Sequence, residues 1–313
     1  MKRWFKTLTA TCLVIPFAQC ALVPGDNIAR AAEPAPAAAA AATVDADPAL
    51  WVVKDEDTTI YLFGTVHVLK PGLSWFDEAV KDAFDTSDQL MLEMVLPEDQ
   101  AEMAKVMIPL AIDQSGKTLS SRLDARQLSA YQAAMASVGL PAAQFEMFEP
   151  WLPAITLAIA PLAKLGYDPE QGAEKQLTRA AKSAGKDIKG FETFSEQLGF
   201  FDTLPETAQI AYLNTVVRDM DKTGPLLDKL VEQWAKGDPD ALAATMNESL
   251  TESPEIADAI LYNRNARWAE QIKARLDQPG TVFVAVGAGH LAGAKSVQDY
   301  LKEQGITVKR VDY

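Results

Sequence analysis

The chain has 313 residues, of which 48% are hydrophobic and 23% are charged, a composition typical of a globular protein. Its formal net charge of −14 argues against nucleic acid and against an anionic membrane surface as partners. The length allows one large domain or two small ones.

The N-terminus has the features of a secretory signal peptide. The basic residues Lys2, Arg3 and Lys6 precede the apolar run "LTATCLVIPFAQCALV", and "ARA" at 29–31 offers a small-x-small cleavage site. The run is too short and too interrupted for a membrane span. We therefore predict a signal peptide over residues 1–31, a periplasmic or secreted location, and no transmembrane span in the mature chain.

Both cysteines, Cys12 and Cys20, lie in this segment, so a chain cut after Ala31 has no disulfide and no thiol nucleophile. A lipoprotein anchored at Cys20 is the alternative, although "FAQC" matches the usual small-residue context poorly. Residues 32–48, "AEPAPAAAAAATVDADP", are predicted to be an Ala/Pro-rich linker outside the fold. The folded domain is then expected over residues 49–313.

The domain is predicted to begin with strands. "ALWVVKDEDTTIYLFGTVH" indicates two short strands joined by the polar turn "KDEDT". Ser74 is a predicted cap for a helix over "WFDEAVKDAFDT". "QLMLEMVLP" then indicates a buried strand that ends near Glu93. This strand–helix–strand order predicts a parallel pair of strands with a crossover helix.

From about residue 98 to residue 184 the apolar spacing is helical. Asp124 is a predicted cap for "ARQLSAYQAAMASV", and Gly139 is its predicted stop. "WLPAITLAIAPLAKL" is almost wholly apolar, but its short length and its two prolines indicate a buried helix rather than a membrane span. "EQGAEKQLTRAAKSAGK" is a further predicted helix.

The rest of the chain returns to strands at two places. "KDIKGFE" predicts a strand, and residues 194–276 then predict helices with prolines near their starts. "GTVFVAVGAGH" predicts a strand and a glycine-rich turn, "AGAKSVQDYLKEQG" a helix, and "ITVKRVDY" a last strand. No break in composition divides this region, so we predict a single α/β domain with a mixed sheet and large helical insertions.

Two histidine turns share one pattern. His67 and His290 are the only histidines of the chain, and each comes three residues after a glycine, Gly64 or Gly287, behind an apolar strand. A lone histidine in this position is usually a turn residue. Glycines permit a tight turn that aims an imidazole over the sheet, and sites in open α/β sheets form outside the carboxyl ends of strands. The pair therefore predicts one functional site.

Two carboxylates lie at the ends of predicted strands. Glu93 ends "LMLE", and Glu192 follows "DIKGF", where its alternative role is to cap the next helix. Two histidines and a carboxylate suit a divalent metal with an open water position. They also suit metal-free acid–base chemistry with a histidine near its ordinary pKa. The absence of a G-x-S-x-G elbow from the sequence disfavours a serine hydrolase.

With these motifs the chain resembles the TraB/GumN family, whose relatives include PrgY and the Tiki proteases. The matching stretches follow the family's order and cover nearly all of the chain after the linker: "YLFGTVHVLKP", "LMLEM", "GKDIKGFETFSEQLGFFDTLP", "LYNRNARWAEQI" and "VFVAVGAGHLAG". The GumN-like branch is the most similar. Either GxxH turn alone would be a weak signal, but the whole set is specific.

The resemblance implies a TraB/GumN fold of the Tiki type, similar in broad outline to erythromycin esterases. It implies metal-dependent peptidase activity for the Tiki branch and a loose association with polysaccharide gene clusters for GumN-like members. For TraB and PrgY it implies reduction of a peptide pheromone's activity, by binding or by cleavage. Carried over residue by residue, the site and the metal ligands would be His67, Glu93 and His290, with Arg264 and Asn265 nearby.

Two further residues gain weight from the resemblance. "GFET" matches the family well, which favours Glu192 as a site residue. Arg264 is expected to orient a site carboxylate or to bind a substrate carboxylate with two hydrogen bonds, and its alternative is a surface cation.

The sequence therefore predicts an exported metal-dependent hydrolase, foremost a peptidase, that binds Mn, Co or Zn. The expected catalytic residues are His67, Glu93, His290, Glu192 and Arg264. One alternative is a non-catalytic protein that binds a peptide or a polysaccharide in the same pocket. The other is an esterase-like hydrolase that uses His and Glu without a metal. The substrate class is a peptide or a polysaccharide-related molecule, and no oligomeric state is predicted.

Overall fold

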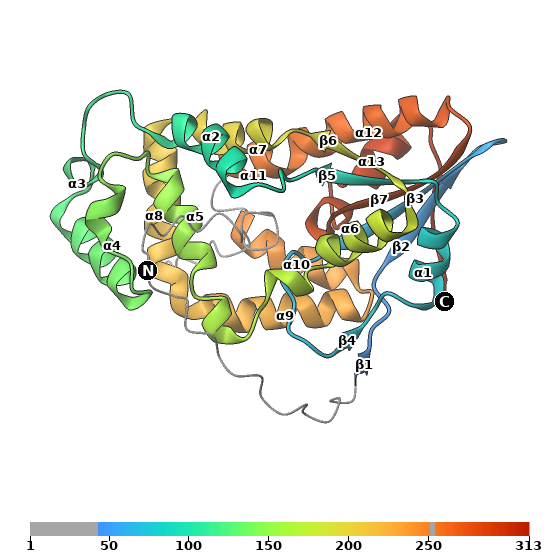
Figure 1. Ribbon diagram of the computed structural model, residues 1–313, viewed down its shortest axis with the longest axis horizontal. Helices are drawn as coiled ribbons and strands as arrows, with labels where there is room; N and C mark the ends of the chain where they lie inside the picture. Colours follow the sequence, from blue (N-terminus) through green and yellow to red (C-terminus); the bar gives the residue numbers. More distant parts are fainter. Residues whose placement is uncertain (1–42, 251–253, 313) are drawn as a thin grey trace, which may run out of the picture.

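The computed structural model describes residues 43–250 and 254–312 (Figure 1). The predicted signal peptide and most of the predicted linker lie outside these residues. The strands of the main sheet are β2 (Leu50–Lys54), β3 (Thr58–Thr65), β5 (Gln89–Met94), β6 (Asp187–Glu192), β7 (Gly280–Gly287) and β8 (Val308–Arg310). Their order across the sheet is β6-β5-β7-β3-β2-β8.

The sheet is mixed, as predicted. Strands β6, β5, β7 and β3 run parallel, while β2 pairs antiparallel with both β3 and β8. The hairpin of β2 and β3 confirms the predicted turn at "KDEDT". The predicted β3–β5 pair is only partly correct, because β7 lies between the two parallel strands. β7 is buried over its last six residues, as expected for a central strand covered on both faces.

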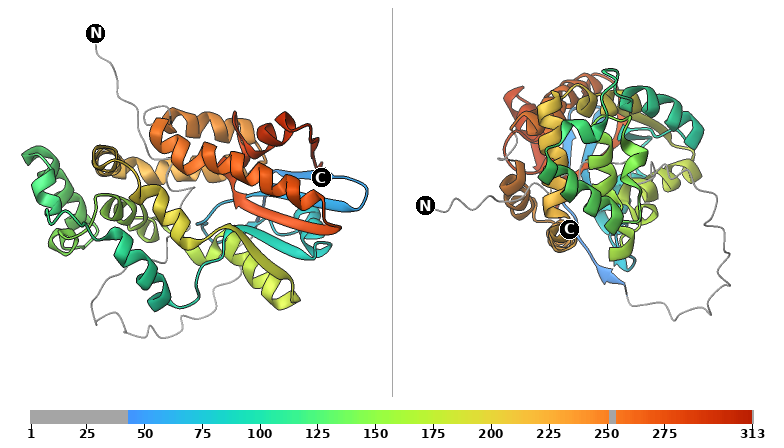
Figure 2. Two further views of the ribbon diagram at one scale, coloured as in Figure 1. Left: turned by 90° about the horizontal axis from the view of Figure 1, so that it is seen from above. Right: turned by 90° about the vertical axis from the view of Figure 1, so that its left-hand side faces the viewer.

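Thirteen α-helices are found in the described part of the chain. They are α1 (Glu78–Asp85), α2 (Gln100–Ala111), α3 (Leu119–Arg122), α4 (Ala125–Ser137), α5 (Trp151–Ile159), α6 (Ala173–Ala184), α7 (Phe194–Asp202), α8 (Glu206–Asp219), α9 (Thr223–Ala235), α10 (Pro239–Leu250), α11 (Pro254–Ala257), α12 (Asn263–Leu276) and α13 (Val297–Glu303). The sheet lies between α12 and α13 on one face and α1 and α6 on the other, and helices α2 to α5, α7 and α8 extend beyond one end of the sheet (Figures 1 and 2).

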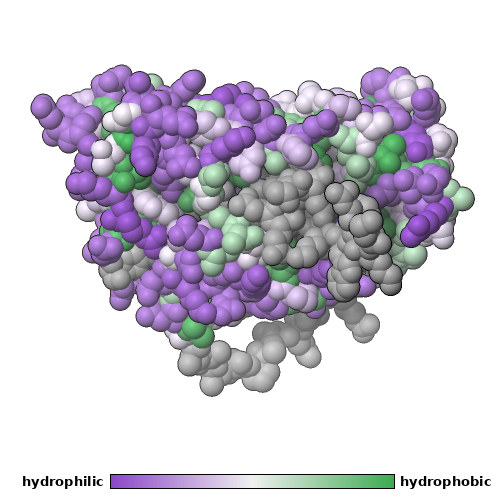
Figure 3. All heavy atoms as spheres, turned by 180° about the vertical axis from the view of Figure 1, so that it is seen from behind, coloured by the Kyte–Doolittle hydropathy of each residue, from purple (hydrophilic) through white to green (hydrophobic). Residues whose placement is uncertain are grey.

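Local signals explain several helix boundaries. Asp124 caps α4 through a capping box with Gln127, as the sequence predicts. Helix α5 is buried along most of its length, which confirms a core helix, and no described helix is long and apolar enough to cross a membrane. The surface seen in Figure 3 is mostly hydrophilic, in keeping with the charge of the chain.

Two boundary predictions were wrong. Ser74 lies in the short strand β4 (Leu73–Ser74) and does not cap α1, whose N-cap is Asp77. The reason is Trp75, which is buried against Phe63 with ring centroids 5.5 Å apart and keeps the chain extended. The predicted linker also ends earlier than residue 48, because β1 (Val44–Asp45) pairs with β4 and is followed by buried residues.

Candidate functional site

The predicted site residues all lie at the carboxyl ends of the parallel strands. His67 comes two residues after β3, Glu93 lies near the end of β5, and Glu192 is the last residue of β6. His290 lies in the turn η7 (Ala288–Leu291) that follows β7. Arg264, in the first turn of α12, reaches this edge from the face of the sheet that α12 covers. The four strands β3, β7, β5 and β6 are neighbours, so their ends bring the side chains together.

The two histidine turns pack directly on one another, and this close packing favours the first glycine. A Cβ atom on Gly64 would lie 3.0 Å from the Cα atom of Ala288, within the second turn. The backbone carbonyl of Gly64 also accepts a hydrogen bond from the indole of Trp234, at 2.7 Å. The glycine of the first turn therefore has an architectural reason, because the end of β3 closely approaches the turn after β7.

Arg264 is the centre of a buried charge network. Its Nη2 lies 2.7 Å from Oε2 of Glu93 and 2.9 Å from Oε2 of Glu192, and its side chain is 2% exposed. Its Nη1 donates to the carbonyl oxygen of Ile260 at 2.9 Å. This carbonyl belongs to the π-helical turn η6 (Asp258–Tyr262) just before α12. Arg264 therefore orients two site carboxylates, and the surface-cation alternative is excluded.

Glu192 belongs to the same network and does not cap a helix. Its carboxylate accepts hydrogen bonds from the indole of Trp268 at 3.0 Å and from the amide of Gln197 at 3.1 Å. The cap of α7 is Thr193, in a capping box with Glu196. The capping alternative for Glu192 was therefore wrong.

His290 is fully buried as a neutral imidazole. Its Nδ1 lies 2.5 Å from Oδ1 of Asn265, whose own amide donates to the carbonyl of Lys295 at 2.8 Å and is thereby oriented. Nδ1 therefore carries the proton, and Nε2 presents a lone pair 3.3 Å from Nη1 of Arg264. Burial, together with the guanidinium of Arg264, lowers the pKa of His290 to about 3 against the opposing charge of Glu93.

Glu93 is ionised in spite of its burial. Burial alone would raise its pKa, but Arg264 and the two histidines lower the pKa to about 2. The backbone N–H of Gly287 also donates to Oε1 at 2.7 Å. Glu93 therefore links the network to the pocket, whose wall it shares with His67.

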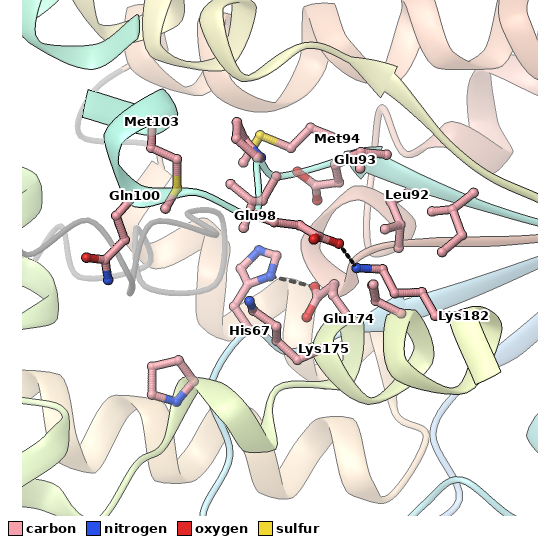
Figure 4. Close-up of a pocket in the computed structure, with 16 residues that line it drawn as sticks. His67, Leu92, Glu93, Met94, Glu98, Gln100, Met103, Glu174, Lys175 and Lys182 are labelled. Atoms are coloured by element: carbon pink, nitrogen blue, oxygen red, sulfur yellow. Dashed lines mark hydrogen bonds and ion pairs between the residues drawn. The ribbon is translucent and has the colours of Figure 1, made fainter. Parts of the chain in front are cut away.

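His67 lies on the other side of this pocket, which has a volume of about 480 Å³ (Figure 4). Its Nδ1 is 2.5 Å from Oε1 of Glu174, and the hydroxyl of Thr65 donates to the same carboxylate. Burial acts most strongly and lowers the pKa of His67, but Glu174 and Glu93 together outweigh it, so the pKa is raised. Its Nε2 is buried, and no hydrogen-bond partner for it is found in the described part of the chain.

Glu174 reaches His67 because the start of α6 sits directly on the first histidine turn. A Cβ atom on Gly172 would lie 2.2 Å from the carbonyl oxygen of His67, so only glycine fits there. The N–H of Ala173 donates to the carbonyl of Val66 at 3.0 Å. Sequence reasoning missed Glu174. Its one signal, an acidic residue in the first turn of a helix, is ordinarily explained by the helix dipole.

Gln197 and Trp268 were also missed. Gln197 bridges Glu93 and Glu192 through one amide nitrogen, at 3.2 Å and 3.1 Å. Trp268 packs its ring 4.3 Å from that of His290, measured between centroids. Neither residue has a local pattern that separates it from ordinary helix positions.

The three predicted metal ligands do not form a metal site as they are arranged here. Within residues 43–250 and 254–312, no group of three or more His, Cys, Asp or Glu side chains is placed to hold an ion. Nε2 of His290 and Oε1 of Glu93 are 3.6 Å apart, a separation that two ligands of one ion would have. However, the guanidinium of Arg264 faces the same lone pair of His290. The guanidinium of Arg264 therefore lies beside His290 and Glu93, two of the three predicted metal ligands.

The buried groups predict a loss of stability in acid. The pKa of His290 is about 3 in the fold against an ordinary 6.5, so below pH 6.5 the unfolded chain binds this proton first. We expect the free energy of unfolding to fall by up to about 1.4 kcal/mol for each pH unit from 6.5 downward. Glu93, with a pKa of about 2 against 4.5, adds to the loss below pH 4.5.

Urea unfolding at pH 6.5, 5.5 and 4.5 measures this slope. The raised pKa of His67 opposes this slope in part near pH 6.5, where the unfolded histidine is only half protonated, and His67 ceases to contribute at lower pH, where it is protonated in both states. The variant His290→Asn, which cannot titrate, should show a flatter slope over the same range. An unchanged slope in this variant would show that His290 titrates normally in the fold.

The chain forms a mixed α/β domain in which two histidine turns pack on one another and two glutamates lie at the ends of strands. These features define its class of protein. The model of the TraB/PrgY/gumN family matches residues 49–310, and the chain belongs to that family. This confirms the family and the fold type that the sequence predicts.

Two curated relatives match the chain over most of their own length, and a third matches it over a shorter part. The chain is 24% identical over 255 residues to the uncharacterized protein YbaP of Escherichia coli (strain K12), which covers 82% of this chain and 92% of YbaP. It is 25% identical over 275 residues to an uncharacterized protein of Treponema pallidum, covering 81% of this chain and 80% of that protein. A metalloprotease TIKI homolog of Amphimedon queenslandica is 26% identical over 162 residues, 43% of this chain and 31% of the relative. No solved structure matches the chain.

Proposed function

We propose that the chain is an exported hydrolase, foremost a peptidase, whose reaction takes place in the pocket between His67 and Glu93. The observation that carries the proposal is the state of His67. Nδ1 forms an ion pair with Glu174 at 2.5 Å, and Nε2 is buried at the pocket with neither a hydrogen-bond partner nor an ion-pair partner in the described part of the chain. The relative named a metalloprotease supports hydrolysis as the reaction class.

His67 is the group in this pocket that is best suited to move a proton. Glu174 contacts Nδ1 of the ring and raises the pKa of His67, which favours the protonated imidazole, whose Nε2 can give a proton to a carbonyl oxygen or a leaving group. Glu93, ionised at all ordinary pH values, favours that positive charge across the pocket. Its low pKa makes it a weak base, so its contribution is electrostatic.

His290 and Arg264 support this arrangement without lining the pocket. His290 remains neutral, and its ring nitrogens are aligned by Asn265 and Arg264. Arg264 in turn fixes the position of the Glu93 carboxylate. Two imidazoles whose environments move their pKa values in opposite directions are typical of a site that assigns them different roles.

Metal dependence is a second candidate, and two observations favour it. Each histidine has an oxygen partner at Nδ1, Glu174 for His67 and Asn265 for His290, which is the usual arrangement of outer-shell groups around metal-binding histidines. The Amphimedon queenslandica relative is also named a metalloprotease. Binding of Mn, Co or Zn by His67, Glu93 and His290 would require Arg264 to move away from His290.

Chelation separates the two candidates. We expect the purified chain to cleave members of a peptide library, and to keep its turnover after treatment with a chelator, because the observed arrangement leaves Arg264 in the cation position. Loss of turnover by at least tenfold, restored by added Mn, Co or Zn, would contradict the metal-free form and favour the metal-dependent one. Calorimetry of Mn, Co or Zn binding to the purified chain distinguishes the metal-free from the metal-dependent form without an assay of peptide cleavage.

Export is also part of the proposal. It rests on the basic residues, the apolar run and the "ARA" sequence near the N-terminus, which lie outside the described residues. Mass spectrometry of the chain recovered from the producing cell should find an N-terminus near residue 32. A diacylglyceryl group on Cys20 would instead show the lipoprotein, and an intact N-terminus on cytoplasmic protein would contradict export.

A further inference from the structure

Strands β5 and β7 separate where the pocket begins. β5 pairs with β6 as far as Met94 but with β7 only as far as Leu92. At the end of β7, the N–H of Gly287 donates to the side chain of Glu93. In the described part of the chain, the side of β5 that faces β7 therefore has no strand partner beyond Leu92.

From Leu92 onward the chain runs along one side of the pocket, and residues 92–98 are called the open wall. Residues 92–98 all line the pocket in an unbroken run, and residues 95–98 belong to no strand or helix. Leu96 precedes Pro97, which restricts Leu96 to extended backbone conformations. Val95 is 47% exposed although it is apolar. An extended segment with an unpaired side is a template for another strand.

The opposite wall carries the proposed chemistry. Figure 4 shows Leu92, Glu93 and Met94 on one side of the pocket, and His67, Glu174 and Lys175 on the other. A chain that paired with the open side of β5 would lie between these walls. Its backbone carbonyls would then pass beside the imidazole of His67.

The open wall is largely apolar. Its apolar residues are Leu92, Met94, Val95, Leu96 and Pro97, and Met103 and Ile188 line the pocket beside them. Near them, Lys182 of α6 forms an exposed ion pair with Glu98 across the pocket. Side chains of an extended ligand alternate between its two faces, so every second residue would contact this apolar surface.

We propose that the substrate is an extended peptide that adds as a β-strand to the open side of residues 92–98 and places alternate apolar side chains on this wall. The inference rests on the proposed function for the reaction, but the binding mode is independent of it. A peptide offers the repeating N–H and C=O groups that an open strand needs. An oligosaccharide lacks this repeat, so the proposal decides between the two substrate classes.

Backbone methylation of a peptide tests the strand pairing. The probes are end-capped heptapeptides of alternating leucine and alanine, each with one amide N-methylated, and the protein is the full chain with His67→Asn, which prevents cleavage. Blocking a hydrogen bond that faces the protein should weaken binding about tenfold or more. We expect this effect at alternate amides and less than about a threefold effect at the amides between them.

A pair of variants tests the protein side of the same contact. Leu96→Pro removes one backbone N–H from the open wall, whereas Leu96→Ala keeps it and shortens only the side chain. Leu96→Pro should weaken binding of the unmethylated peptide at least tenfold more than Leu96→Ala. If Leu96→Pro fails to fold, the series of methylated peptides, measured on a chain whose residues 92–98 are unchanged, tests the strand addition by itself.

The outcomes for the proposed strand addition and for the proposed hydrolase are distinct. Equal effects at neighbouring amides, or no binding of the peptides while cello-oligosaccharides bind, would overturn the strand addition. Alternating effects without cleavage of any peptide by the unaltered chain would support the strand addition and overturn the hydrolase. Cleavage of peptides by the unaltered chain, together with equal effects of methylation at neighbouring amides, would support the hydrolase and overturn the strand addition.

Discussion

Replacing His67 by asparagine is expected to reduce peptide hydrolysis by about 10²–10⁴-fold, the loss that follows removal of a proton-transferring side chain. The amide of asparagine can still donate to Glu174, whose Oε1 lies 2.5 Å from Nδ1 of the histidine. It has no equivalent of Nε2, the nitrogen buried at the pocket. Initial rates on a peptide library measure the loss, and thermal unfolding by circular dichroism measures the fold.

His67→Ala is the matched comparison. It removes Nε2 and also leaves Glu174 with one partner fewer, so it should be as inactive as His67→Asn but less stable. If well-folded His67→Asn keeps the turnover of the unaltered chain, the histidine is a structural turn residue. The pattern shared with His290 would then be explained by the packing of Gly64 on Ala288 alone.

The second large effect is expected at Arg264. Arg264→Met should lower the free energy of unfolding by about 3–5 kcal/mol, because it leaves buried carboxylates without their cation. The side chains of Glu93 and Glu192 are each 4% exposed, and both contact Arg264 at 2.9 Å or less. Urea unfolding at pH 7 measures the change.

Arg267 provides the control, since it contacts the same Glu192 at 3.3 Å from a side chain that is 47% exposed. Arg267→Met should change stability by no more than about 1 kcal/mol. Adding Glu93→Gln and Glu192→Gln to Arg264→Met should recover part of the loss, because the unpaired charges are removed. Equal losses for the two arginine variants would show that burial of the network does not matter.

Much of the site was predictable because its residues end strands with strong local signals. The apolar runs before His67, Glu93 and His290 identify β3, β5 and β7, and parallel strands place their carboxyl ends on one edge. The sequence could not predict that β7 inserts between β3 and β5, because strand order is set by contacts between segments far apart in the chain. Glu192 was a candidate from its place after a predicted strand, Arg264 was expected from the resemblance, and the structure supplies their physical connection.

The residues that were missed act through tertiary contacts alone. Glu174 looks like any acidic residue in the first turn of a helix, and its role depends on Gly172 bringing α6 onto the His67 turn. Gln197 is one of many polar residues in helices, and only the fold buries it between two carboxylates. The prediction that Ser74 caps a helix was wrong for a similar reason, because Trp75 is buried and α1 begins only at Glu78.

The most direct test of the proposed hydrolase is the incubation of a peptide library with the purified chain in ¹⁸O-labelled water, followed by mass spectrometry. The proposal predicts new C-termini, each carrying one ¹⁸O atom in its carboxyl group, that appear with the unaltered chain, together with unlabelled new N-termini, and are lost with His67→Asn. Peptides that bind the chain but yield no labelled termini would contradict the hydrolase and favour a protein that only binds.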